Sequence, residues 1–534
     1  MKLNKHRILT ATFLAFIFTS FVTAQTIDEA IKYSLTQPTG TARSIALGGA
    51  MGALGGDYSA ITINPAGIAV YRSSEFSFTP SLIFNQTDSW YDRAADNISY
   101  SSNTASSDKF SFPVNQISYV GTLKSMREID RGVVSSHFAI GYNRTQNYNR
   151  ETFIQGNNIQ SSFLDEFVDI ANNSGLTPFY TQLAYNAFLL DPVSEDENNG
   201  YFNAFEYLDN GTPLWGPDNG LNQRRVIDES GYSGDFNITY GINISNKLLL
   251  GGTLSLATLN YEKKYEHYEE VAPSENQWTY LNNYSFSENL STNGTGINLK
   301  LGAIFKPINS VRIGASFKTP TFYSINEEYW TEINIPKSFA DQNTEGKTQF
   351  ESDYGDYSYN FRTPYQATGS FAYIFGTKGL ISIDYEYTDF ANMNFKSKQA
   401  VTNDITALED LNNQISDVYK PTHNIRIGAE YKLLPTIALR AGAASFQSPY
   451  KNQLIINKED GTSEKFDFEN EKYDITGGIG FMHQNMSIDI SYLYRNISYI
   501  NSLYYAPHVS DESQYPAKIT STDHQLAVTL GWRF

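Results

Sequence analysis

Apolar and polar residues alternate with a period of two along many short segments of this chain. The last ten residues predict a strand with one apolar face, which carries Leu526, Val528, Leu530, Trp532 and Phe534. The residues between them are polar or small: Gln525, Ala527, Thr529, Gly531 and Arg533. Such a strand fits a barrel in a membrane, because the outer face of the barrel contacts lipid and its inner face is polar.

The charged residues of the other alternating segments fall consistently on the polar face. Lys300, Arg312, Arg426 and Arg440 each stand between apolar or small neighbours. An Arg or Lys that faces lipid at the middle of a bilayer costs about 2–4 kcal/mol. We therefore expect these four cations to face the lumen.

About fourteen segments show the alternation, and they predict an all-β, membrane-spanning antiparallel barrel. They lie near residues 74–84, 113–123, 133–147, 231–245, 247–260, 295–306, 310–324, 360–375, 379–391, 422–432, 435–446, 473–483, 485–497 and 523–534. After the first long connection, very short turns alternate with long loops, as in barrels with periplasmic turns and extracellular loops. Counts of twelve and sixteen strands also fit, because the first segments alternate least clearly.

The start of the chain has the pattern of a secretory signal peptide. Lys2, Lys5 and Arg7 precede an apolar stretch from Ile8 to Val22, and the small residue Ala24 follows at the expected distance. We expect residues 1–24 to be removed, with an uncleaved anchor as the alternative. No later segment approaches the roughly 18 consecutive apolar residues of a membrane-spanning helix. These features predict the outer membrane of a Gram-negative-type bacterium.

Composition excludes several classes of partner. The chain has no cysteine, so it has neither disulfides nor the lipidated cysteine of a lipoprotein. With 39 basic and 57 acidic residues its net charge is −18, which argues against a nucleic-acid partner. The 38 Tyr and 34 Phe alongside a mean hydropathy of −0.40 suit a barrel with aromatic rims and a polar lumen. Phe534 resembles the terminal aromatic residue by which the barrel-assembly machinery recognises its substrates.

Residues 25–73 precede the first strand and are rich in small residues. A glycine-rich run from Gly48 to Gly56 suggests a nucleotide-binding loop, but no βαβ unit surrounds it and ATP is absent outside the inner membrane. The Gly346-Lys347-Thr348 triplet lacks the upstream glycine of a phosphate-binding loop. We expect residues 25–73 to fold compactly inside the lumen, with a turn at Asn64-Pro65.

These segments carry a resemblance to a known family. Gly55-Gly56-Asp57-Tyr58-Ser59-Ala60 leads into Asn64-Pro65-Ala66-Gly67, and this stretch is similar to the N-terminal plug of the FadL/TodX group of outer-membrane transporters. Residues 296–320, 426–431 and 439–442 are also similar, although less specifically. The resemblance implies a fourteen-stranded barrel blocked by a plug, with hydrophobic cargo captured outside and released laterally into the membrane. It implies plug or gating roles for Asp57, Asn64, Pro65, Ala66 and Gly67.

Residues 148–230 depart from the usual layout of that group, because so long a loop follows the third strand. Two amphipathic stretches, 161–170 and 178–190, predict helices. Their apolar faces carry Phe163, Phe167, Phe179 and Leu183. These side chains could form an apolar groove that captures ligand, or they could pack on each other and cap the barrel.

Evidence for catalysis or for a metal is weak. The seven histidines are isolated in sequence, without the spacing of a metal site. An outer-membrane hydrolase would need a Ser–His pair with an orienting group. Ser135, Ser136 and His137 are adjacent, but neighbouring residues of a strand point to opposite faces. We expect neither an enzyme nor a cofactor.

The pattern as a whole predicts a passive outer-membrane transporter for hydrophobic small molecules such as long-chain fatty acids. Its partners would be that ligand and the surrounding lipid and lipopolysaccharide. A surface adhesin or structural barrel, and less readily an outer-membrane hydrolase, are the alternatives. We expect Asp57 and Asn64 to hold the plug through bonds to the lumen cations Lys300, Arg312, Arg426 or Arg440.

Overall fold

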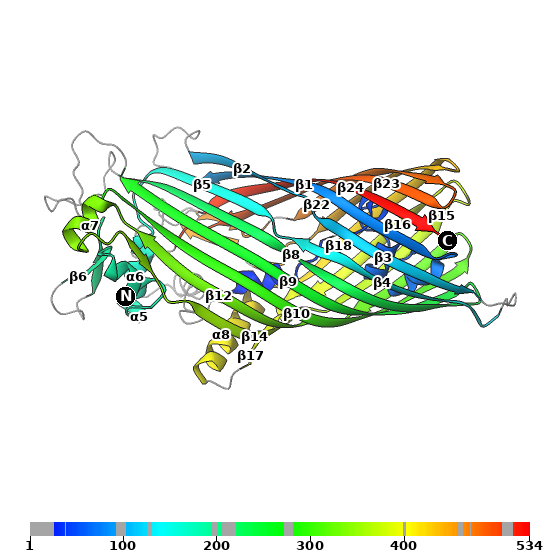
Figure 1. Cartoon of the computed structure of the whole chain (residues 1–534), viewed down its shortest axis with the longest axis horizontal. Helices are drawn as coiled ribbons and strands as arrows, with labels where there is room; N and C mark the ends of the chain where they lie inside the picture. The colour runs from blue at the N-terminus through cyan, green and yellow to red at the C-terminus, as the bar shows by residue number, and fades with distance from the viewer. Residues whose placement is uncertain are drawn as a thin grey trace.

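The computed structural model describes residues 26–37, 39–91, 103–124, 131–193, 200–205, 220–271, 281–398, 402–451, 453–457, 463–469, 471–504 and 516–534. They form a closed antiparallel barrel of fourteen strands, which confirms the predicted fold class. The barrel closes where β1 (Glu75–Tyr91) pairs with β24 (Ala517–Arg533) (Figure 1). The predicted signal peptide lies outside the described residues.

Seven further strands cross the barrel wall without a break. They are β8 (Leu221–Ile244), β9 (Leu248–Val271), β10 (Asn283–Ile308), β18 (Pro421–Leu434), β19 (Ile437–Phe446), β22 (Lys472–His483) and β23 (Met486–Asn501). The remaining strands are divided into β2 (Thr104–Ser111) and β3 (Val114–Lys124), β4 (Val133–Asn147) and β5 (Arg150–Ile159), β11 (Val311–Lys318) and β12 (Phe322–Asn334), β14 (Gly355–Arg362) and β15 (Gln366–Ile374), and β16 (Gly379–Asp389) and β17 (Asn394–Ser397). Pro113, Pro320 and Pro364 stand in three of these breaks, because proline cannot donate a ladder hydrogen bond.

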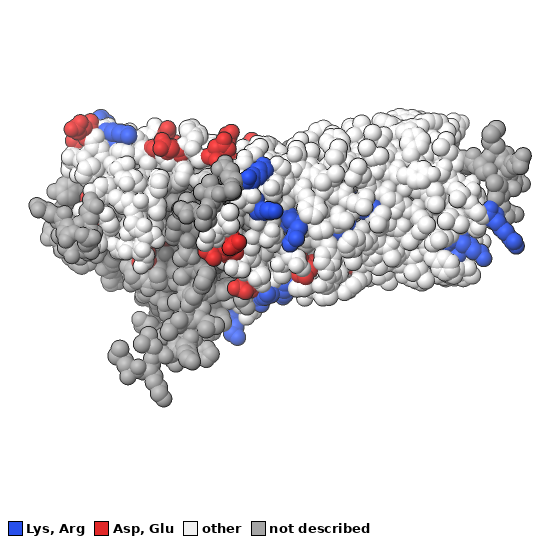
Figure 2. Space-filling model, turned by 90° about the horizontal axis from the view of Figure 1, so that it is seen from below, with Lys and Arg blue, Asp and Glu red and all other residues white. Residues whose placement is uncertain are grey.

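The two faces of the wall differ as the alternation predicts. On β10 the side chains of Ile297 and Leu301 are 45% and 53% exposed, whereas that of Lys300 between them is 3% exposed. Figure 2 shows the result from outside: a surface almost free of charge over the part of the barrel toward the C-terminal end of β24. This apolar band is the lipid-facing surface.

The two ends of the barrel are unequal. Very short turns such as the one between β22 and β23 lie at the end that carries Phe534, which we assign to the periplasm. The opposite, extracellular end carries α5 (Leu164–Ser174), α6 (Thr181–Asn186) and α7 (Lys337–Asn343) (Figure 1). It also carries β6 (Leu190–Pro192) with β7 (Tyr201–Asn203), β13 (Gln349–Glu351), α8 (Thr402–Val418), and the hairpin of β20 (Gln453–Asn457) and β21 (Ser463–Asp467).

Several strands extend further toward the extracellular end than the alternation indicates. β10 begins at Asn283 rather than near 295, and β9 ends at Val271 rather than near 260. In these extensions the outer face is polar and the inner face carries tyrosines and other large side chains. The period of two is still present there, but it no longer separates apolar from polar residues.

The third strand is interrupted between β4 and β5. β4 pairs with both β3 and β8, whereas among the described residues β5 forms a ladder with β8 alone. Side chains connect its other edge: Ser89 Oγ donates to the carbonyl of Phe153 (2.5 Å), and Ser107 Oγ donates to that of Glu151 (2.8 Å). The wall is therefore not held by a backbone ladder in this sector.

Residues 26–37 and 39–73 form the plug, whose helices lie inside the barrel and contact its wall (Figure 1). They fold into α2 (Ile27–Ser34), α3 (Ala42–Ala46), α4 (Tyr58–Ile63) and the 3-10 helix η1 (Pro65–Val70). Each begins at a residue whose side chain caps the backbone: Thr26, Thr41, Asp57 and Asn64. Among the described residues, no helix is both long and apolar enough to span a membrane.

Candidate functional site

Asn64 fastens the plug to the barrel wall. Its amide nitrogen donates to the carbonyl of Gly52 within the plug (2.7 Å) and to that of Ala303 on β10 (3.1 Å). Its amide oxygen accepts from the backbone N–H of Ala66 (3.1 Å), which starts the helix that Pro65 opens. The Asn-Pro-Ala-Gly motif is thus a compact turn, and one of its side-chain bonds crosses to the wall.

Asp57 acts within the plug. Its Oδ1 accepts from the hydroxyl of Thr41 (2.8 Å) and from the backbone N–H of Ser59 (2.8 Å), so it joins the start of α4 to the residue that caps α3. Two ion pairs join plug and wall: Arg43 Nε donates to Glu430 on β18 (3.1 Å), and Lys32 of α2 pairs with Glu229 on β8. Gly67 packs against Gly55, and the carbonyl of Gly67 accepts a hydrogen bond from the backbone N–H of Gly56 (3.1 Å).

The expected pairing of Asp57 and Asn64 with lumen cations is wrong. The lumen cations do face inward, but carboxylates of the wall itself neutralise three of them. Lys300 pairs with Asp235 (2.8 Å), Arg426 with Glu386, and Arg440 with Glu430 and Asp489. Arg312 does reach the plug, but it donates to the backbone carbonyl of Leu54. Each of the three neutralised cations pairs with a carboxylate on another strand, so the sequence of one strand does not show the pairing.

Glycines on the inner face of the wall let the plug backbone approach it closely. A Cβ atom on Gly302 would lie 1.9 Å from Oδ1 of Asn64, and one on Gly442 would lie 2.3 Å from the backbone nitrogen of Gly48. Any larger residue at these positions would have to displace the plug or distort the strand. The wall is therefore shaped to this plug.

Replacing Gly302 by Val should loosen the plug without opening the barrel ladder. Overpacking costs about 1–3 kcal/mol, enough to shift a closed-to-open equilibrium by about tenfold or more. We expect added conductance in planar bilayers while the barrel stays resistant to heating in detergent. The matched control is Gly369→Val on the exposed face of β15, where an added Cβ would meet no atom within 4 Å. Equal conductance of the two variants would contradict a close fit between Gly302 and the plug.

Large aromatic side chains line the lumen above the plug. This aromatic lining consists of Tyr148, Tyr261, Tyr323, Tyr329, Tyr359 and Phe361, all buried in one hydrophobic cluster. The first plug helix inserts into it, because Ile27 and Ile31 belong to the same cluster and the ring of Tyr33 packs edge-on against Tyr261 and Phe361. Apolar side chains of α2 therefore pack directly against the wall at this level.

Tyr180 connects the aromatic lining to the extracellular end. It packs against that cluster and also against a second cluster around α5 and α6. Its ring stacks on Phe286 at 5.9 Å, and its hydroxyl contacts that of Tyr329 (2.5 Å). Apolar side chains thus follow one another without interruption from the extracellular helices to the plug.

The two predicted loop helices are present as α5 and α6, and their apolar residues are buried. Phe163, Phe167 and Leu183 are at most 5% exposed, and Phe163 packs against Phe167 and Phe286. Phe179 packs edge-on against Tyr329 (5.2 Å). The helices therefore cap the barrel, which is one of the two arrangements that the sequence allows. A role in ligand capture stays a prediction.

A buried polar network holds the start of α5. Glu269 accepts from the backbone N–H of Phe163 (2.8 Å), from the hydroxyl of Ser162 and from Gln223 (2.8 Å), and it contacts His267 Nε2 (3.1 Å). Ser162 and His267 share this carboxylate, and no hydrogen bond between the two is observed in the described part of the chain. A nucleophile activated by a base needs that bond. The network instead fixes the start of α5 to β9, which is a structural role.

Ser135 and His137 do form a hydrogen-bonded pair. The hydroxyl of Ser135 lies 2.9 Å from His137 Nε2, and that of Thr122 lies 3.2 Å from Nδ1. Both residues point inward, since they are two apart on β4. Neither lines any of the five cavities described for this part of the chain. No three His, Asp or Glu residues of the described segments are grouped to hold a metal ion.

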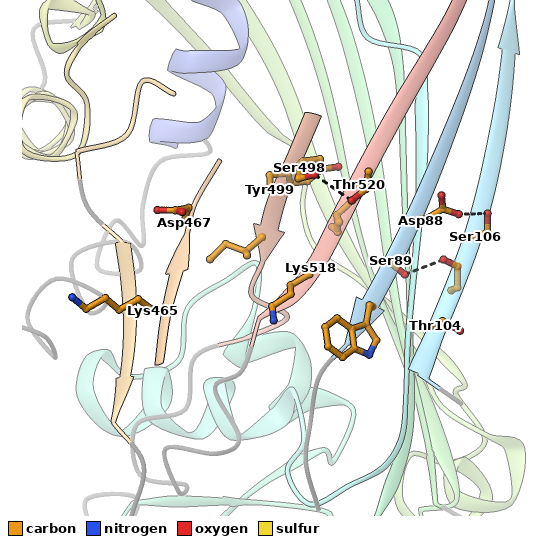
Figure 3. A pocket seen from close by; sticks show the side chains of 14 residues that line it. Asp88, Ser89, Thr104, Ser106, Lys465, Asp467, Ser498, Tyr499, Lys518 and Thr520 are labelled. Carbon is orange, nitrogen blue, oxygen red and sulfur yellow. Dashed lines mark hydrogen bonds between the residues drawn. The ribbon is translucent and has the colours of Figure 1, made fainter. Parts of the chain in front are cut away.

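A cavity of about 770 Å³ lies on the outer wall near the extracellular end (Figure 3). Asp88 and Trp90 continue the outward face of β1, Lys518 lies over the ring of Trp90 at 4.8 Å, and the β20–β21 hairpin contributes Lys465 and Asp467. Asp88 accepts a hydrogen bond from Ser106 (2.8 Å). This polar groove opens outside the barrel and is separate from the plugged lumen.

Sequence reasoning did not single out the aromatic lining. Several of its members stand at inward positions of the extracellular strand extensions, such as Tyr261 on β9, Tyr329 on β12 and Tyr359 on β14. An inner face was expected to be polar or small, so inward aromatics were not considered. Runs of alternating Tyr and Phe beyond the lipid-facing segments would have been the signal.

Comparison with known proteins rests on structure alone, because no protein-family model and no curated sequence matches the chain. The crystal structure of a Pseudomonas aeruginosa FadL homologue is similar with a TM-score of 0.51 at 12% identity, over 94% of this chain and 100% of that one. The Pseudomonas putida toluene transporter TodX (TM-score 0.47, 12% identity) and the Ralstonia pickettii toluene transporter TbuX (0.45, 13%) each cover 94% of this chain and are covered completely.

The first of these similarities is high enough to compare folds, and it matches the plug and barrel described above. The plug motif predicted the same group from sequence. The chain therefore has the fold of the FadL group, a plugged fourteen-stranded barrel of the outer membrane.

Proposed function

We propose that this protein is a passive outer-membrane transporter for hydrophobic small molecules. The observation that carries the proposal is the unbroken series of apolar side chains from α5 and α6 through Tyr180 to α2 of the plug. A lumen that served only polar solutes would gain nothing from such a lining. A ligand site is typically apolar with a few placed polar groups, and the tyrosine hydroxyls of the aromatic lining supply those groups.

The charges around the aromatic lining favour a neutral cargo. Two nearby lysines already pair with wall carboxylates, Lys32 with Glu229 and Lys263 with Glu288 (3.4 Å), and a third, Lys398, donates to the carbonyl of Ile325 (3.2 Å). A carboxylate ligand would have to compete for them. Aromatic or alkyl compounds without a charge fit this environment better than long-chain fatty acids, which remain the second candidate cargo.

The plug argues against a purely adhesive or structural role. A barrel that only displays loops needs no segment fitted to wall glycines such as Gly302 and Gly442. A hydrolase is supported only by the Ser135–His137 pair, which has no described cavity beside it. Transport uses the plug, the aromatic lining and the cap together.

Uptake by cells that carry the protein in their outer membrane tests the proposal. We expect faster uptake of a dilute radiolabelled neutral aromatic hydrocarbon than in cells without the protein, and a smaller gain for a long-chain fatty acid. Phe361→Ser should lower uptake at limiting concentration by about tenfold, because a buried Phe contributes about 1.5–3 kcal/mol. Phe371→Ser, on the exposed face of β15, is the matched control. Uptake equal to that of cells lacking the protein would refute transport.

A further inference from the structure

A cavity of about 390 Å³ lies at the periplasmic mouth, between the plug and the wall. The plug contributes Leu54, Gly55, Gly56 and residues 70–73, and the wall contributes side chains of β11, β18 and the turn after β15. Five cations line it and one carboxylate, Glu430, faces them. The five cations are Arg43, Arg72, Arg312, Lys432 and Arg533.

Two of the five cations, Arg43 and Arg533, are paired with carboxylates. Glu430 is shared between Arg43 (3.1 Å) and Arg440 (2.8 Å), and Arg533 pairs with Glu75 (2.7 Å). No described carboxylate lies within 4.0 Å of Arg72, Arg312 or Lys432. All three line the same cavity, where the charges of Arg72 and Arg312 repel each other.

The side chain of Arg312 has few hydrogen-bond acceptors around it. One of its terminal nitrogens donates to the carbonyl of Leu54, but its Nε is buried and has no hydrogen-bond acceptor. A buried donor of a charged group without an acceptor is costly, and such groups usually have a partner. The carbonyl of Leu54 is the one acceptor that the described residues offer to Arg312, so the charge of this guanidinium is open to an anion in the cavity that it lines.

We propose that this cavity is a binding site for a small oxyanion of the phosphate type. The anion would be neutralised by Arg312 and Lys432 on the wall and by Arg72 on the plug. Because plug and wall both contribute cations, a bound anion ties the two together and stabilises the closed barrel. The site is separate from the aromatic lining, and its occupancy does not depend on which cargo is transported.

Calorimetric titration of the full-length protein in detergent with inorganic phosphate tests the site, against sodium chloride at equal ionic strength. We expect phosphate to bind, and the Arg312→Gln/Lys432→Gln variant to bind at least about tenfold more weakly, since charge-assisted bonds are lost. The Lys465→Gln/Lys518→Gln variant, which removes two positive charges from the outer-wall groove, is the matched control. It should bind phosphate like the wild type.

Hydrogen–deuterium exchange of plug peptides covering residues 54–73 provides a second readout. Phosphate should slow exchange there in the wild type and in the control, and should leave the Arg312→Gln/Lys432→Gln variant unchanged. Resistance to heating in detergent verifies that each barrel is folded. Absent binding to the wild type at millimolar phosphate, or equal binding by all three proteins, would overturn the proposal, whatever the uptake assay shows.

Discussion

Deletion of residues 25–67 should convert the protein from a closed barrel into an open pore. A fourteen-stranded barrel encloses more space than an eight-stranded one, whose interior side chains just fill it. Without the plug, water would fill the part of the lumen that Ala303 and Gly442 border. We expect single-channel conductance in planar bilayers to rise on the order of tenfold and the preference for hydrophobic cargo to be lost.

The barrel itself should survive this deletion. Its closure depends on the ladder between β1 and β24, and none of the strands that form the wall belongs to the deleted segment. The wall carboxylate Glu430 loses Arg43 but keeps Arg440, whereas Glu229 loses Lys32 and keeps the hydrogen bond from the hydroxyl of Tyr261 (2.6 Å). Resistance to heating in detergent verifies the fold. A folded deletion variant that conducts no more than the intact protein would remove the plug from gating and favour a structural role.

Replacing Phe163, Phe167, Phe179 and Leu183 by Ser should detach the cap. Burial of each such side chain is worth about 1.5–3 kcal/mol, so the four together exceed what two short helices can lose and remain docked. We expect rapid proteolysis between Leu164 and Asn186, with an intact, heat-resistant barrel. Phe188→Ser is the matched control, because Phe188 lies on the same loop and is 40% exposed.

Uptake by the detached-cap variant then separates the two roles of the loop. A fall in uptake at limiting cargo that disappears at high concentration would support capture by these side chains. Uptake equal to that of the Phe188→Ser control would leave α5 and α6 as a cap alone. Resistance of the loop to protease in the fourfold variant would contradict the packing argument itself.

The wall of the barrel could be predicted from local sequence because each strand meets the same two environments along its length. Ile297, Leu299 and Leu301 face lipid and Lys300 cannot, whatever the neighbouring strands are. The same reasoning located all fourteen strands. It ended several strands short of their extracellular ends. There the wall faces water and the cap, and the alternation no longer separates apolar from polar residues.

The candidate site was predicted in part. The Asn64-Pro65-Ala66-Gly67 motif indicated a compact plug, since Asn and Pro constrain the backbone locally. The apolar stripes of residues 161–170 and 178–190 indicated two helices. Neither pattern contains information on what those elements touch.

By itself the sequence determined the strand alternation, the compact turn of the plug and the helices of the cap, because these depend on residues that are close in the chain. Only the tertiary structure decided that Asn64 bonds to Ala303, that Arg43 of the plug meets Glu430, and that Tyr33 packs on Tyr261 and Phe361. These contacts join residues more than 200 positions apart. Their partners are set by the register of neighbouring strands and by barrel closure, and a linear pattern does not record which inward side chains stand at the same level of the lumen.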